Sequence, residues 1–368
     1  MYISKIDITN FRLIQNLSFS FNSTLNILVG NNGSGKTSIL EAISILAVGK
    51  SFRTNNLLNV INKEYCEFIV KSSVIYDVND RVINLSIKRD SQCKKTLRLN
   101  KKNITVSESA KALPFFVFHS DYLINLVNIR QDRLKLINWG LFHVEHNFNS
   151  IWKKYNNILK NRNKLLKNKT NYNYIKAWDV EFAKVSNEIF DVKSFYFQQL
   201  KEYFYIYIKK FLPEYNIELK YYKGWGDEFS LTELLKQSFV KDLSLGYSSL
   251  GAHRADFIIS INDTPIKEVL SKGQQKLVSI ALCLSSLKLL KDKYNKSYAI
   301  LIDDLSSELD VNNVSIVYKY LLELNMQLII TCIDITQLPK FLIQLDNSEI
   351  HYLKRGKIYN QSESLLEL

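Results

Sequence analysis

Residues 30–37 read Gly-Asn-Asn-Gly-Ser-Gly-Lys-Thr and fill every fixed position of the pattern G-x-x-x-x-G-K-[ST]. An apolar run at residues 25–29 precedes this segment, and a helix-like stretch at residues 38–43 follows it. Such a segment works between a strand and a helix, because glycines let successive backbone N–H groups converge on a phosphate. The helix N-terminus adds its partial positive charge. The motif therefore predicts an α/β fold that binds a nucleoside triphosphate.

Each residue of the loop has an expected role at the nucleotide. Lys36 is expected to reach the β- and γ-phosphates and is a candidate catalytic residue, while the Thr37 hydroxyl is expected to bind Mg²⁺. We expect the following residues to surround the phosphates of ATP: Gly30, Asn31, Asn32, Gly33, Ser34, Gly35, Lys36, Thr37 and Ser38.

Composition restricts the class of protein. With 368 residues the chain can form one large domain with an insertion, or two domains. No apolar stretch approaches a membrane span, and the first residues alternate like a strand rather than forming a signal peptide. The four cysteines are widely spaced and contain no C-x-x-C, so we expect reduced thiols and a cytoplasmic protein.

The positive charge is concentrated in one segment. The formal net charge is +13, and residues 151–223 hold fifteen basic against seven acidic residues. Residues 153–169 carry seven basic residues and no acidic one. A basic helical face attracts phosphate backbones, although a solvated lysine-rich helix or a surface for a protein partner would look alike. The candidate DNA contacts are Lys160, Arg162, Lys164 and Lys167.

Periodicity divides the chain into three parts. Short alternating runs around the loop predict strands up to about residue 120. Apolar residues then recur at helical spacing through residues 151–166 and 182–207. The apolar runs at 298–302 and 327–331 predict buried parallel strands. We therefore predict a discontinuous ATPase domain of residues 1–120 and 240–368, with a helical insertion domain at 121–239.

Two carboxylates end the apolar run at 300–302. At a strand end facing the phosphate loop, Asp303 is the candidate Mg²⁺ ligand, and Asp304 is the candidate general base for the attacking water. The alternative for this pair is two solvated loop acids.

A second candidate anion site lies at residues 270–275, Leu-Ser-Lys-Gly-Gln-Gln, ahead of a helical run. Ser271 offers a hydroxyl, and the turn offers free N–H groups and a side-chain amide. The segment could instead be a simple helix N-cap. Since the phosphate loop already surrounds one side of a triphosphate, a second anion turn is most useful when it comes from another copy of the chain.

The order of these motifs resembles that of the ATP-binding-cassette ATPases. Several segments are similar to one family among them, the RecF-type recombination mediators of bacteria, and the resemblance extends over essentially the whole chain. The segments are Asn-Phe-Arg at 10–12, Gly-Lys-Ser-Phe-Arg at 49–53, Asn-Trp-Gly-Leu-Phe-His at 138–143, His-Arg-Ala-Asp at 253–256, and Leu-Ile-Asp-Asp-Leu-Ser-Ser-Glu-Leu-Asp at 301–310.

The resemblance implies an ATPase head that dimerises head to tail around two ATP molecules. In such a dimer Ser271, Gly273 and Gln274 would contact the γ-phosphate of the partner's ATP. Asp310 would lie at the dimer interface, and Arg12 would lie near the nucleotide. The family pattern further implies weak, DNA-stimulated ATP hydrolysis, binding to double-stranded and gapped DNA, and RecR-like and RecO-like partners that help to load RecA in gap repair.

The chain departs from the cassette pattern at several positions. Asp304 stands where a longer glutamate is usual, which suggests slow turnover. The segments that usually hold a glutamine and a switch histidine read Phe-His-Ser-Asp at 118–121 and Thr-Cys-Ile-Asp at 331–334, and the second offers Asp334 as a switch residue. Paired arginines are expected near residue 132, where Asp132 and Arg133 stand.

Two other classes of ATPase share the same motifs. The ATPase subunit of a membrane transporter is the alternative function, but it would not need a basic helical insertion of this size. A coiled-coil, chromosome-organising ATPase would separate the two halves of its head by hundreds of heptad residues, and this insertion is only about a hundred residues long.

Overall fold

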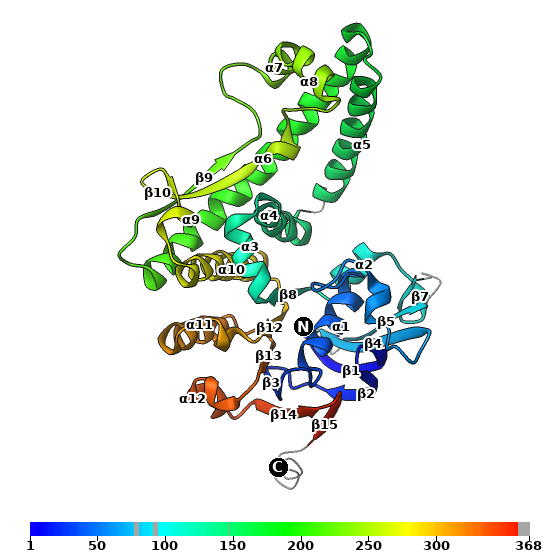
Figure 1. Cartoon of the computed structure of the whole chain (residues 1–368), viewed down its shortest axis with the longest axis vertical. Helices are drawn as coiled ribbons and strands as arrows, with labels where there is room; N and C mark the ends of the chain where they lie inside the picture. The colour runs from blue at the N-terminus through cyan, green and yellow to red at the C-terminus, as the bar shows by residue number, and fades with distance from the viewer. Residues whose placement is uncertain (77–80, 91–94, 146, 360–368) are drawn as a thin grey trace. The chain divides into compact units, whose positions relative to one another are not determined.

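The chain folds into two packing units, which different parts of the sequence form. The computed structural model describes residues 1–76, 81–90, 95–145 and 147–359 (Figure 1). The first unit comprises Met1–Tyr122 and Asn295–Leu368, and the second comprises Leu123–Tyr294.

An antiparallel sheet forms one layer of the first unit. Buried and exposed residues alternate along its strands, so one face packs on the core and the other meets solvent. The strand order is β2-β1-β4-β5-β6-β7. The strands are β1 (Tyr2–Phe11), β2 (Ile14–Ser20), β4 (Glu67–Tyr76), β5 (Arg81–Asp90), β6 (Lys95–Leu99) and β7 (Lys102–Asn103).

A second sheet of the first unit is parallel except at one edge. Its order is β15-β14-β3-β13-β12-β8, and only the β14–β15 pair is antiparallel. Every residue of β3 and β13 is buried, as expected for strands covered on both faces. The strands are β3 (Leu25–Val29), β8 (Phe115–Phe118), β12 (Ala299–Asp303), β13 (Leu328–Cys332), β14 (Ser348–Lys354) and β15 (Lys357–Tyr359). The predicted strands at 298–302 and 327–331 are therefore present, each shifted by one residue.

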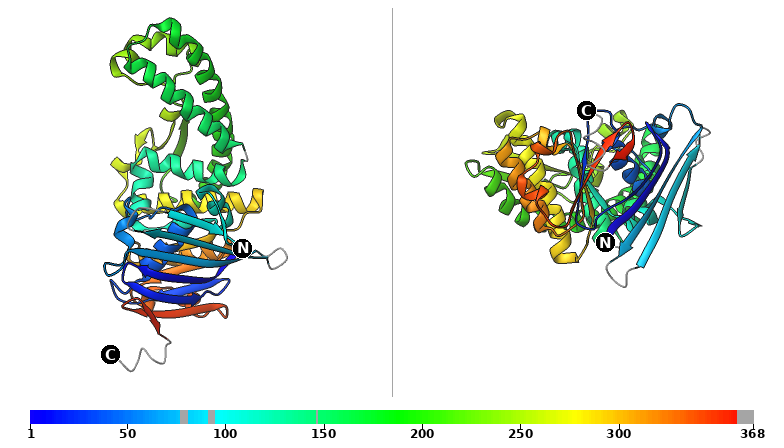
Figure 2. Two further views of the ribbon diagram at one scale, coloured as in Figure 1. Left: turned by 90° about the vertical axis from the view of Figure 1, so that its right-hand side faces the viewer. Right: turned by 90° about the horizontal axis from the view of Figure 1, so that it is seen from below.

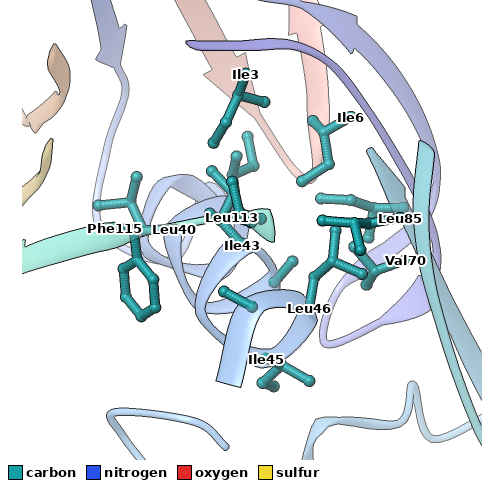
Figure 3. Close-up of a cluster of buried hydrophobic side chains, with 14 of the residues drawn as sticks. Ile3, Ile6, Leu40, Ile43, Ile45, Leu46, Val70, Leu85, Leu113 and Phe115 are labelled. Carbon is teal, nitrogen blue, oxygen red and sulfur yellow. The ribbon is translucent and has the colours of Figure 1, made fainter. Parts of the chain in front are cut away.

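Helix α1 (Lys36–Val48) is almost completely buried, which explains why its sequence is apolar nearly all round. Its side chains Leu40, Ile43 and Leu46 meet residues of the antiparallel sheet, such as Ile6 and Val70 (Figure 3). The other short elements of this unit are η1 (Leu57–Val60), α2 (Val106–Ala112), η3 (Leu305–Ser307), α11 (Val311–Glu323), η4 (Ile335–Gln337) and α12 (Lys340–Ile343), while α3 (Ser120–Asn128) crosses the unit boundary.

The second unit is mainly helical. The 40-residue helix α6 (Tyr172–Phe211) runs beside α5 (Phe148–Lys167), and the two share an apolar core that includes Tyr155, Phe182 and Ile189 (Figure 2). The remaining helices are α4 (Arg130–Val144), α7 (Leu231–Gln237), α8 (Phe239–Leu245), η2 (Ala252–Arg254), α9 (Ile266–Val269) and α10 (Lys272–Tyr294). A small antiparallel sheet has the order β11-β10-β9, with β9 (Ile217–Tyr222), β10 (Asp256–Ile261) and β11 (Thr264–Pro265).

Packing groups residues 240–294 with the helical unit, whereas the sequence analysis placed them with the two ends of the chain. The reason is that β10 pairs with β9 and that α10 packs along α6, where the Tyr196 and Ser286 hydroxyls lie 3.0 Å apart. Within the described residues, no helix is both long enough and apolar enough to cross a membrane.

Ile43 provides a test of the core in Figure 3, because its side chain is fully buried in α1. Ile43→Ala should lower the free energy of unfolding by about 2–5 kcal/mol, since it removes apolar contacts and leaves a cavity. The matched control is Val311→Ala, at a side chain that is 80% exposed, where we expect a change within about 0.5 kcal/mol. Urea unfolding measures both, and equal effects would contradict the described core.

Candidate nucleotide-binding site

The phosphate loop joins the buried end of β3 to the start of α1. Gly33 and Gly35 have φ angles of 77° and 112°, in the region that favours glycine. Gly35 is the N-cap of α1, and no side chain of the described residues caps the helix there. The first N–H groups of a helix have no acceptor within it, so this turn presents donors and a positive dipole end to an anion.

Gly30 is required by a close backbone approach. A Cβ atom there would lie 2.4 Å from the Leu353 carbonyl oxygen and 2.8 Å from Ser34 Oγ. The backbone N–H of Gly356 also donates to the Ser34 carbonyl oxygen at 2.8 Å. The β14–β15 hairpin therefore packs against the phosphate loop and donates a hydrogen bond to it. This contact was not predicted from the sequence.

The Lys36 ammonium closes across the loop. Its side chain is only 7% exposed, and Nζ donates to the carbonyl oxygens of Gly30 and, at 3.1 Å, Asn31. Burial lowers the pKa of Lys36, while the nearby Asp304 and Asp303 carboxylates oppose that change. The buried Lys36 ammonium and the uncapped N–H groups of α1 together form an electropositive site that suits phosphate oxygens.

Thr37 and Asp303 come together although 266 positions separate them in the sequence. Thr37 Oγ1 donates to Asp303 Oδ1 at 2.8 Å. A hydroxyl and a carboxylate are the oxygen donors that Mg²⁺ takes from proteins beside phosphates and water, so this pair fits that ion. Within the described residues no group of three or more His, Cys, Asp or Glu side chains could hold a metal ion by itself.

Thr331 joins the two acids. Strand β13 lies between β3 and β12, and its register places Thr331 beside Asp303. Its hydroxyl donates to Asp303 Oδ1 at 2.9 Å and accepts from the Asp304 backbone N–H at 3.0 Å. Thr331 was not among the residues predicted for the site. The signal was its hydroxyl at the end of the apolar run Leu328–Ile330.

Asp304 has an unusual backbone conformation, with φ of 50°. Its Oδ1 atom is buried and has no hydrogen-bond partner among the described residues. Burial raises the pKa of Asp304, and the Ser307 hydroxyl and the Lys36 ammonium act against that shift. A carboxylate with an unoccupied acceptor and a raised pKa has the properties of a general base.

Arg12 binds an acid of α1. Its Nε and Nη2 atoms donate to Glu41 Oε2 and Oε1 at 3.0 and 2.7 Å, and Glu41 is completely buried. Arg12 thus neutralises a buried charge in the helix that follows the phosphate loop. Its contact with the nucleotide stays a prediction.

The second anion turn lies in the other unit, at the start of α10. Ser271 Oγ accepts from the Gln274 backbone N–H at 3.3 Å, and the Ser271 backbone N–H donates to Gln274 Oε1 at 3.0 Å. This reciprocal pair of hydrogen bonds is a capping box. Within the chain, Ser271 and Gln274 therefore cap the N-terminus of α10, as the N-cap alternative predicted. Among the described residues, a Cβ atom at Gly273 would meet only Ser271 Oγ, at 4.0 Å, so none of them requires glycine there.

One predicted DNA contact needs correction. Arg162 is fully buried, because it faces the interior of the α5–α6 pair rather than solvent. Its Nε atom binds Asp179 at 2.7 Å, and its Nη1 atom binds Asp242 and the Ser248 hydroxyl at 2.8 Å each. Such a guanidinium cannot reach a DNA backbone. The other three predicted contacts, Lys160, Lys164 and Lys167, are exposed.

Three further acids and one arginine from the sequence analysis have local partners. Asp310 Oδ1 caps α11 by accepting from the Asn313 N–H at 3.0 Å, and Asp334 Oδ1 accepts from the Thr336 N–H at 2.9 Å. These bonds lower the pKa of both acids. The remaining two residues belong to two separate ion pairs: Asp132 accepts from Lys135 at 2.6 Å, and Arg133 binds Asp256 at 2.7 Å.

In comparisons with known proteins, this chain is similar to proteins of DNA replication and repair. A family model described as the RecF/RecN/SMC N terminal domain matches residues 2–347. The DNA replication and repair proteins RecF of Francisella tularensis subsp. holarctica and subsp. novicida are each 35% identical over 345 residues, which cover 93% of this chain and 97% of the relative.

Solved structures share the fold. A structure of the recombination mediator protein RecF-ATP in the RecFOR pathway has a TM-score of 0.82 at 23% identity and covers 97% of both chains. An Smc head bound to the C-winged helix domain of ScpA has a TM-score of 0.61 at 14% identity and covers 100% of both chains. The expected α/β fold of a cassette-type ATPase head with additional helices is thereby confirmed.

Thr331→Val tests the hydroxyl that joins the two acids. The substitution keeps the shape of the side chain but removes hydrogen bonds to a carboxylate and to a backbone N–H. We expect ATP hydrolysis to slow by about 10- to 100-fold while ATP binding changes little, because the phosphate loop is untouched. Thr331→Ser keeps the hydroxyl and is the matched control. Equal turnover in the Val variant and the wild type would remove Thr331 from the site.

Proposed function

The chain belongs to the RecF family of DNA replication and repair proteins, and we propose that it is an ATP-dependent recombination mediator whose grip on DNA is switched by ATP. The observation that carries this proposal is the contact of Thr37 with Asp303, beside Lys36 and Asp304, at the end of one parallel sheet. Family membership replaces the alternative of a transporter ATPase subunit.

The bound nucleotide is proposed to be ATP with Mg²⁺. The N–H groups of the phosphate loop and the Lys36 ammonium would hold the phosphates. Thr37 and Asp303 are the residues that would hold Mg²⁺, whose positive charge neutralises phosphate oxygens when it is bound. Thr331 keeps the Asp303 carboxylate oriented for that role.

Asp304 is proposed to position the attacking water and to accept its proton. The side chain of aspartate is one methylene shorter than that of glutamate, so it reaches the water less well, and we expect slow hydrolysis that DNA stimulates. Slow ATP hydrolysis suits a protein in which hydrolysis sets the time of release from DNA, rather than one that moves along DNA.

Two copies of the chain are proposed to close around two ATP molecules. Gly273 supports this idea, because no described residue explains the glycine at this position in the first turn of α10. A ligand that approaches the α10 turn from outside does explain it. Ser271, Gly273 and Gln274 of one copy would then contact the γ-phosphate held by the other, with Asp310 at the dimer interface.

The DNA surface is proposed to include one face of α5. Lys160, Lys164 and Lys167 are exposed and spaced four and three residues apart, so they follow one side of the helix. The family further suggests double-stranded and gapped DNA as ligands, RecR-like and RecO-like partners, RecA loading as the outcome, and a cytoplasmic location.

Asp304→Asn separates binding from hydrolysis. The amide cannot accept the proton, so we expect hydrolysis to fall by about 100-fold or more while the ATP-bound dimer accumulates on DNA. Because burial raises the pKa of Asp304, wild-type hydrolysis should decline with falling pH at a higher pH than for an exposed aspartate. Turnover assays and size-exclusion chromatography measure these effects. Lys36→Ala, which should lose ATP binding itself, is the control, and normal turnover in the Asn variant would contradict the assignment.

The α5 lysines are tested by the triple change of Lys160, Lys164 and Lys167 to Gln. We expect weaker DNA binding at low salt, and a logarithmic salt slope that is smaller by about two to three. A matched control removes the same charge from α6 in the same unit, at Lys184, Lys209 and Lys210. If the two triple variants bind DNA alike, α5 is not a DNA surface.

A further inference from the structure

A pocket lies beyond the C-terminal end of α1, at the opposite end of this helix from the phosphate loop. Its volume is about 310 Å³. The thirteen residues of α1 separate the two places by roughly 20 Å. The lining residues are Gly49, Lys50, Ser51, Thr54, Asn55, Asn56, Leu57 and Arg89.

Two cations, Lys50 and Arg89, line this pocket, and a third, Lys95, lies beside its Gly49. Arg89 on β5 stands directly opposite Lys95 on β6, a register in which like charges destabilise a sheet. The Lys95 ammonium lies over Gly49, where a Cβ atom would be 2.8 Å from Nζ. Burial lowers the pKa of Lys95, and the charges of Arg89 and Lys50 lower it further.

Within the described residues, none of these three cations forms an ion pair with an acid, and the buried Arg89 Nε atom has no hydrogen-bond partner. The same strand shows the contrasting case, since the Lys88 ammonium binds Glu67 at 2.8 Å on the other face of the sheet. The carbonyl end of α1 offers only a partial negative charge. No acidic residue in the described part of the chain therefore neutralises this concentration of positive charge by an ion pair.

We propose that this pocket, lined by Lys50, Arg89 and the loop of residues 51–57 and with Lys95 beside it, binds a phosphate group of DNA. The inference rests on the proposed function, and it adds a contact in the first unit that is distinct from both the ATP site and α5. A phosphate supplies several acceptor oxygens and negative charge to the converging ammonium and guanidinium groups.

The polar surroundings favour a phosphate over a whole nucleotide. Thr54 and Asn55 add a hydroxyl and an amide to the rim of the pocket. The described residues that line it include no aromatic ring on which a base could stack. A phosphate could reach such a site as part of DNA or as a free ion, and competition distinguishes the two sources.

The test uses the full chain with ATP and the double variant Lys50→Gln/Lys95→Gln. Because neither lysine touches the phosphate loop, ATP binding should match the wild type. DNA affinity at low salt should fall by about tenfold, and the logarithmic salt slope should shrink by about one, because one phosphate fewer is neutralised. The control Lys63→Gln/Lys319→Gln removes the same charge from exposed sites of the same unit and should leave the slope unchanged.

Inorganic phosphate is the competitor, with chloride of equal ionic strength as its reference. Phosphate should weaken DNA binding by the wild type more than chloride does, and this excess should disappear in the double variant. A double variant that binds DNA like the control, whether or not free phosphate still binds, would overturn the inference. A wild type that fails to bind DNA with ATP would instead overturn the proposed function.

Discussion

The candidate site depends on the hydrogen bond between Thr331 and Asp303 across two parallel strands. Strand β13 lies between the strand that precedes the phosphate loop and the strand that ends in the two acids. The carboxyl ends of parallel strands meet at one edge of a sheet, and ligands of α/β folds bind there. The register of β13 therefore brings Thr37, Asp303 and Asp304 within reach of each other, and its only hydroxyl fixes both acids.

Gly30 and Gly273 differ in whether a neighbouring atom of the chain occupies the place of a side chain. Gly30 is needed because the Leu353 carbonyl oxygen occupies the place of a side chain. Gly273, in the first turn of α10, has no such neighbour among the described residues. The proposed contact of a second copy with this turn rests on that contrast.

Sequence reasoning predicted the parts of the fold that local pattern determines. The phosphate loop with its flanking strand and helix, and the buried strands around residues 300 and 330, follow from glycine spacing and apolar runs. Prediction from the sequence was wrong where the exposure of a residue depended on which side of a helix faces the core. Arg162 belongs to a run of basic residues, but its side chain lies on the buried face of α5. There it binds Asp179 and Asp242 instead of facing solvent. Thr331 was missed for a similar reason, since its role arises from register with a strand that is distant in sequence.

The position of β3 in its sheet also has a consequence for synthesis on the ribosome. This strand lies between β13 and β14, so the N-terminal strand before the phosphate loop pairs with residues 328–332 and 348–354. The support under Gly30 likewise comes from Leu353 and Gly356. The candidate nucleotide site is thus assembled from residues 30–37 and from residues between 303 and 356, and it cannot form until residue 356 has been translated. A nascent chain keeps its phosphate loop unfinished for most of its synthesis, and premature termination yields a product that has the motif without its function.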